Sequence, residues 1–118
     1  MVEPPDLKTP FRNDTERSLE LAALLETSVT IEQWLHLSAN PKSIPADLRE
    51  LLAGSVQSGD SVELRLRRWA NVYSEELRAV LDARNRAVHG IRLTDAELRG
   101  ATWVARYLLR LLEPQNAA

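Results

Sequence analysis

Cysteine is absent from this sequence of 118 residues, and so are long apolar runs. Without cysteine the chain forms no disulfides and no thiolate metal sites. No apolar run approaches the roughly 18 residues of a membrane span, so we expect no membrane-embedded segment. The first residues also lack the basic and apolar regions of a secretory signal. Together these absences predict a cytoplasmic protein.

Several motifs of common enzyme classes are missing as well. The sequence has no glycine-rich phosphate loop and no serine-nucleophile elbow of the kind found in hydrolases. It has two histidines, and no acidic cluster accompanies His89. Zinc and two-metal mechanisms need such a cluster of ligands. We therefore expect neither a metal nor a cofactor.

Lysine is scarce, because Lys8 and Lys42 are the only two in the chain. The net charge of −2 argues against a broadly basic protein that coats nucleic acid. The charge is unevenly placed, however: residues 1–63 carry five basic and eleven acidic side chains, whereas residues 64–92 carry seven arginines and three acids. Arginine matches phosphate groups bidentately. The positive field is therefore concentrated around residues 64–92, where it matters to an anionic ligand, although a high arginine content can also simply reflect genome composition.

The apolar residues recur at helical spacing, and no segment alternates as a strand does. Asn13 and Glu16 form a plausible capping box for a first helix, in which the β-branched run near Thr30 leaves a break or kink open. Gly90 suits the end of a third helix, and residues 94–97 form a capping box for the last one. We predict helices over about 13–39, 45–53, 61–88 and 95–112.

This pattern predicts one all-α domain, an antiparallel bundle of three long helices and one short helix. The bundle spans residues 13–113. Residues 1–12, which contain three prolines, are interpreted as a flexible arm that is ordered only if something docks it. Residues 114–118 form a tail.

The segment 84–92 contains the most informative conflict between pattern and residue type. The apolar stripe of the helix before it, continued at steps of three and four, reaches Arg84 and then Val88. A guanidinium thus falls where the pattern asks for a core residue. Because an unpaired buried charge is costly, Arg84 is expected to have a partner or to face a cleft.

Arg84, Asn85 and His89 together suit the chemistry of RNA cleavage. Arginine can hold a phosphodiester and stabilise the charge of a pentacovalent transition state. Histidine, with an ordinary pKa of about 6.5, can move the proton of a ribose 2′-hydroxyl. Asn85 could position a phosphate oxygen or orient the imidazole. Arg86 and Arg92 are the candidate contacts to the RNA backbone.

Cleavage by internal attack needs a base for the 2′-hydroxyl and an acid for the leaving oxygen. The motif supplies one histidine, and the other, His36, lies on a different helix and is more simply a structural or surface residue. A two-fold homodimer with both motifs facing one cleft would supply both groups. A structural alternative stands beside this: from spacing alone, Arg84 paired to a carboxylate within one chain, with His89 facing solvent, is the more common arrangement.

The run Arg84-Asn85-x-x-Val88-His89-Gly90, at a helix end before a capped helix, resembles the motif of the HEPN superfamily. The motif is an arginine, a polar residue and a histidine four to six residues after the arginine. The resemblance implies a metal-independent endoribonuclease that acts as a homodimer, with Arg84 and His89 catalytic and Asn85 supporting. HEPN members commonly serve as toxins, in phage defence or in RNA processing.

One position departs from the family. HEPN toxins often carry a tyrosine two residues after the histidine, which an antitoxin modifies, but this chain has Ile91 there. Neutralisation through that hydroxyl is therefore not available, although an antitoxin or regulatory partner of another kind stays open. Some HEPN proteins are non-catalytic, so the second hypothesis is a module that dimerises or binds RNA or a partner protein.

Overall fold

The computed structural model describes residues 7–40, 42, 44–46 and 62–112. Helices make up most of this part of the chain, which contains no strand: α1 (Asp14–Ala39), α3 (Val62–Val72), α4 (Ser74–Val88) and α5 (Asp95–Arg110). The prediction of an all-α bundle is confirmed. The short helix expected over 45–53 lies almost wholly outside the described residues, as do the tail 114–118 and the first half of the arm.

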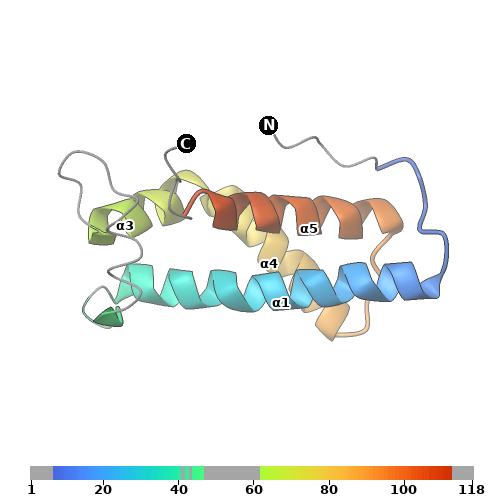
Figure 1. The fold of residues 1–118 in the computed structure, drawn as a ribbon, viewed down its shortest axis with the longest axis horizontal. Helices are drawn as coiled ribbons and strands as arrows, with labels where there is room; N and C mark the ends of the chain where they lie inside the picture. The colour runs from blue at the N-terminus through green and yellow to red at the C-terminus, as the bar shows by residue number, and fades with distance from the viewer. Residues whose placement is uncertain (1–6, 41, 43, 47–61, 113–118) are drawn as a thin grey trace.

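Helices α1 and α5 lie side by side and run in the same direction, while α3 and α4 return the chain between them (Figure 1). The α1–α5 contact is the most extensive in the bundle, followed by the contact of α4 with α5. Helices α3 and α4 thus share one overall direction, which is opposite to that of α1 and α5. Both α1 and α5 begin at the same end, beside the loop that leaves α4.

The expectation of one uninterrupted helix over 61–88 is wrong, because the chain bends at Tyr73 between α3 and α4. Tyr73 has φ −105° and ψ 25°, outside the helical range, although its N–H still donates to the Trp69 carbonyl at 3.1 Å. Because of the bend, the two halves make different contacts. The indole of Trp69 on α3 donates to the Leu108 carbonyl of α5 at 2.9 Å, whereas α4 packs against both α1 and α5. Apolar spacing does not encode such a change of axis.

Helix α1 is continuous through its β-branched run, so the break left open near Thr30 does not occur. The hydroxyl of Thr27 donates to the Ala23 carbonyl at 2.5 Å, and that of the fully buried Ser28 donates to the Leu25 carbonyl at 2.8 Å. These bonds satisfy the polar groups inside the helix. Packing of α1 against the other three described helices then outweighs its weak local propensity.

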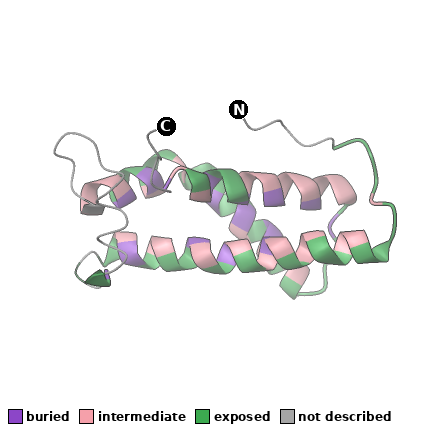
Figure 2. Ribbon diagram, viewed as in Figure 1, coloured by how far each residue is buried: buried purple, intermediate pink, exposed green. Residues whose placement is uncertain are grey.

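The core lies between the helices, where their buried faces point toward one another (Figure 2). Leucines dominate it, and most of its members belong to the helices themselves. The core side chains that are at most 2% exposed are Leu24 and Ile31 of α1, Leu66 of α3, Val80 of α4, Leu93 of the α4–α5 loop, and Leu98, Ala105 and Leu108 of α5.

Candidate functional site

The candidate site stands at the C-terminal end of α4, which closes in a tight, well-bonded turn. His89 is the C-cap, and Gly90 follows with φ +77°, the left-handed conformation that glycine adopts most readily. The Gly90 N–H donates to the Ala87 carbonyl at 3.2 Å and the Ile91 N–H to the Arg86 carbonyl at 2.8 Å. This is the Schellman arrangement of bonds, and it confirms Gly90 as the end of the helix.

Helix α5 begins a few residues later with the predicted capping box. The Thr94 hydroxyl accepts from the Glu97 N–H at 3.1 Å, and the Glu97 carboxylate accepts from the Thr94 N–H at 2.9 Å. Arg86 of α4 adds an ion pair to the same carboxylate at 2.6 Å. The Thr94 backbone bond, followed by the bond from Arg86, lowers the pKa of Glu97 to about 2. Arg86 is thus turned toward α5 and engaged there.

The buried line of α4 follows the predicted apolar stripe as far as Val80 and then lies one position before it, at Ala83 instead of Arg84. Leu77, Val80 and Ala83 are buried, whereas Arg84 is partly exposed and Val88 is 65% exposed. Arg84 therefore lies beside the core line of α4, and Ala83 takes the core position.

Three of the predicted site residues share one outward face of α4. Arg84, Asn85 and His89 recur on it with Leu81 and Val88, at the spacing i, i+3, i+4, i+7 and i+8 counted from Leu81. Asn85, Val88 and His89 are exposed at the surface, and Leu81 is half-buried. The structure thus brings together the three residues of the motif. Arg86 points away from this face.

Arg84 is held from two sides. One terminal nitrogen forms an ion pair with Glu32 of α1, and its Nε donates to Oδ1 of Asn85 at 3.0 Å. The arginine side chain is 21% exposed and that of Glu32 is 45% exposed. Arg84 therefore has the partner that its position demanded, although sequence spacing gave no indication that Glu32, 52 residues away, would supply it.

His89 and Arg92 lie at the surface beyond these contacts. No residue in the described part of the chain bonds to the His89 imidazole; its backbone N–H donates to the Asn85 carbonyl at 3.0 Å, as the helix requires. Arg92 is exposed in the loop and close enough to Asp95 to help lower that carboxyl's pKa. The second histidine, His36, is exposed on α1, one turn after Glu32.

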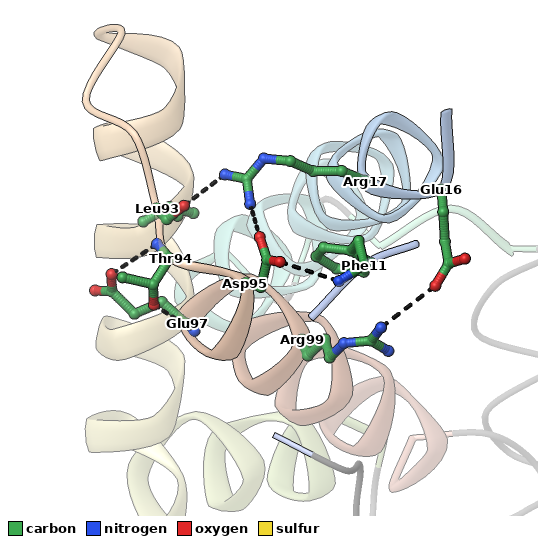
Figure 3. Close-up of polar contacts among 8 residues, drawn as sticks. All are labelled: Phe11, Glu16, Arg17, Leu93, Thr94, Asp95, Glu97 and Arg99. Carbon is green, nitrogen blue, oxygen red and sulfur yellow. Dashed lines mark hydrogen bonds and ion pairs between the residues drawn. The ribbon is translucent and has the colours of Figure 1, made fainter. Parts of the chain in front are cut away.

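A second polar cluster lies on the other side of the loop, and sequence reasoning missed it (Figure 3). Asp95, the first residue of α5, accepts the Phe11 N–H at 3.0 Å and pairs with Arg17, which also donates to the Leu93 carbonyl. The Phe11 backbone bond, with smaller contributions from Arg17, lowers the pKa of Asp95. These groups bind one another.

The same cluster fastens the N-terminal segment to the bundle. The Arg99 guanidinium lies 4.1 Å from the centre of the Phe11 ring and also bonds to Glu16 at 3.3 Å. Residues 7–12, expected as an arm, therefore contact α5. The one signal available in the sequence was that the only phenylalanine of the chain falls in this proline-rich stretch.

The described residues contain no group of three or more histidine and acidic side chains arranged to hold a metal ion. None of the described helices combines the length and the hydropathy needed to cross a bilayer. No family model, curated protein or solved structure matches the chain, so its resemblance to HEPN domains rests on the residues of the motif and on the all-α fold alone.

Proposed function

We propose that this protein is a HEPN-type endoribonuclease that cuts RNA without a metal and acts as a homodimer. The observation that supports this most directly is the placement of Arg84, Asn85 and His89 on one outward face, at a helix end fixed by the Schellman turn. A phosphate-binding group and a proton-transfer group on one rigid surface are the minimum that 2′-hydroxyl attack requires.

In this proposal Arg84 binds the scissile phosphate. A guanidinium has five N–H donors, and the structure uses two of them, one toward Glu32 and one toward Asn85. The remaining donors are free to grip a phosphate bidentately and to stabilise the charge of the phosphorane. Asn85 and Glu32 then act as positioning residues, because they fix the plane of the guanidinium rather than touch the RNA.

His89 moves the protons. As a base, the imidazole of one protomer takes the proton of the 2′-hydroxyl, the 2′-oxygen attacks phosphorus, and the bond to the 5′-oxygen breaks. The imidazole of the partner protomer protonates that leaving oxygen. The products are a 2′,3′-cyclic phosphate and a 5′-hydroxyl. Val88 and Ile91, 65% and 52% exposed beside the motif, would be covered when two copies meet.

Two arginines, Arg86 and Arg92, are expected to contact the RNA backbone, and Arg92 is better placed to do so. It is exposed in the loop three residues after His89. Arg86 is engaged with Glu97 on the far side of α4, so its first role in this proposal is to hold α4 against α5.

A specific observation favours a non-catalytic protein as the second candidate. Arg84 is paired to Glu32 within one chain and His89 is exposed, which is the arrangement expected of a purely structural bundle rather than of a module that dimerises or binds RNA or a partner protein. The two candidates differ in one measurable property, because only the first makes RNA cleavage depend on His89.

The two histidines provide a matched pair for the test. Both are exposed on helical surfaces, and only His89 belongs to the motif. We expect the parent and His36→Ala to cleave single-stranded RNA in the presence of EDTA, leaving 2′,3′-cyclic phosphate ends, and His89→Ala to be inactive. Cleavage that stops with EDTA, or that survives in His89→Ala, contradicts the mechanism. RNA binding without cleavage supports the non-catalytic module.

A further inference from the structure

The bend between α3 and α4 creates a groove beside the motif. The groove has a volume of about 410 Å³, within the range of roughly 300–1,000 Å³ typical of small-ligand sites. Ala70 of α3 and Ser74 of α4 line it on either side of the bend, facing the second half of α1. Its floor is apolar and consists of Leu35, Ala70, Leu77 and Leu81.

The rim of this groove carries hydrogen-bonding groups of both kinds. Arg78 and Asp82 are exposed and lie one helical turn apart on α4. Neither forms an ion pair or side-chain hydrogen bond with another described residue. The rim therefore presents a fork of N–H donors and a pair of carboxylate acceptors above an apolar floor.

Asn85 connects the groove to the candidate site. It lines the groove and also accepts the bond from Arg84. Four residues of helix, about 6 Å along the axis, separate it from His89. A ligand in the groove would thus lie directly beside a phosphate held by Arg84.

We propose that the groove binds the nucleobase next to the scissile phosphate and that it prefers guanine. This inference rests on the proposed function, since it assigns the base specificity of that same site. The flat face of a base suits the leucine and alanine floor. Arginine pairs with the O6 and N7 acceptors of guanine. The N1–H and amino group on the neighbouring edge of the base are donors that the two oxygens of a carboxylate can accept. Uracil has no amino donor, and adenine has no acceptor at position 6.

A protein side chain fits the same groove less well. An apolar residue of a second copy, seated on the leucines, would take Arg78 and Asp82 out of water and pair neither of them, which is costly. Guanine satisfies both groups at once. The opposite charges on the rim therefore favour a base over an apolar protein contact.

The test uses the intact protein with His89→Ala, so that RNA is bound but not cut. Nine-nucleotide RNAs that differ in one central base are compared by fluorescence anisotropy. We expect the guanine-containing RNA to bind roughly ten-fold tighter than the other three, as one bidentate pair provides. Asp82→Asn in this background should remove the preference. Glu26→Gln, which changes an exposed carboxylate of α1, should retain it.

A second variant fills the groove from its edge without touching the core. Ser74 is exposed on the rim, so Ser74→Trp should abolish the preference, whereas Glu75→Trp, one residue along and outside the groove, should not. Equal binding of all four RNAs, or a guanine preference that survives Asp82→Asn, overturns the proposal. A Ser74→Trp protein with an altered oligomeric state and an unchanged preference also overturns it, because the groove is then a protein contact.

These outcomes separate the base site from the proposed function. RNA cleavage by the parent without any guanine preference would support the proposed nuclease function and contradict the guanine site. A guanine preference that depends on Asp82, in a protein that cuts no RNA, would support the guanine site and contradict the proposed nuclease function.

Discussion

The end of α4 and the start of α5 meet at the loop between them, and both carry charged side chains. They differ in how fully these side chains are bonded to the rest of the chain. At the start of α5, Asp95 is bonded by Phe11 and Arg17, and Arg17 also reaches a backbone carbonyl (Figure 3). At the end of α4, Arg84 has two partners and donors to spare, and no described residue bonds to the His89 imidazole. Charges that bind one another hold a fold together, whereas those left open are available to a ligand.

The difference also appears in what each end connects. The cluster at the start of α5 joins three segments of the chain, namely the N-terminal residues, the first turns of α1 and the first turn of α5. Among the described residues, the ion pair that joins the motif face of α4 to α1 is Arg84–Glu32. We therefore expect substitutions at the first end to affect stability and substitutions at the second to affect activity.

The largest effect is expected from Arg84→Ala. If Arg84 stabilises the phosphorane, RNA cleavage should fall by about 10²–10³-fold, as for removal of one donor from a transition-state site. The free energy of unfolding should change by no more than about 1 kcal/mol, because the Glu32 carboxylate of this ion pair is 45% exposed and such pairs contribute little. Rates on a labelled RNA and urea unfolding measure the two quantities. An Arg84→Ala protein that cuts like the parent contradicts the assignment.

Arg17→Ala is the corresponding change at the start of α5. It should lower the stability of the fold and leave the rate of RNA cleavage unchanged. It removes the Arg17 donors to Oδ1 of Asp95, which still accepts the Phe11 N–H, and to the carbonyl of Leu93. Leu93 is only 2% exposed, and its unpaired carbonyl should cost about 2 kcal/mol in the free energy of unfolding. Cleavage by the folded fraction should match the parent. Arg12→Ala is a useful control, since the Arg12 side chain is 87% exposed. Equal stability of the two variants would show that the cluster does not hold the helices.

The turn between the two ends can be tested through a pair of glycines. Gly90 has φ +77° with no atom near an added Cβ, so Gly90→Ala should destabilise the protein by about 1 kcal/mol through backbone strain alone. Gly100 lies inside α5, where an added Cβ meets only ordinary contact with Leu7. Gly100→Ala should stabilise by about 0.5–1 kcal/mol. Thermal unfolding of both variants checks the opposite signs.

The smallest effect is expected on the free energy of unfolding when the pH is lowered. The pKa of Glu97 is about 2 in the folded protein, below its ordinary value of 4.5, so its contribution to stability is full above pH 4.5 and is lost as the pH falls toward 2. The lowered pKa of Asp95 acts in the same direction. Unfolding curves between pH 6 and pH 2 should therefore show declining stability, and Glu97→Gln should flatten part of the decline. An unchanged slope in Glu97→Gln would contradict this account.

The sequence predicted helix boundaries correctly where specific capping residues or a glycine mark them. The capping box at Thr94 and Glu97 and the left-handed Gly90 are both present, because caps and turns depend on residues a few positions apart. The Asn13 side chain accepts from the Glu16 N–H at 2.8 Å, as its capping role requires, but the Glu16 carboxylate turns to Arg12 and Arg99 instead. A distant partner there competes with the local one.

The sequence by itself determined the all-α class, the helix ends at Asn13, Gly90 and Thr94, and the grouping of Arg84, Asn85 and His89 on one turn and a half of helix. All of these follow from spacing along the chain. Only the tertiary structure decided that Arg84 lies beside the core line, that Glu32 holds it, and that Phe11 docks on α5. The bend at Tyr73 and the groove beside it belong to the same group. These features depend on which helices meet, and contacts between residues tens of positions apart leave no periodic trace in the sequence.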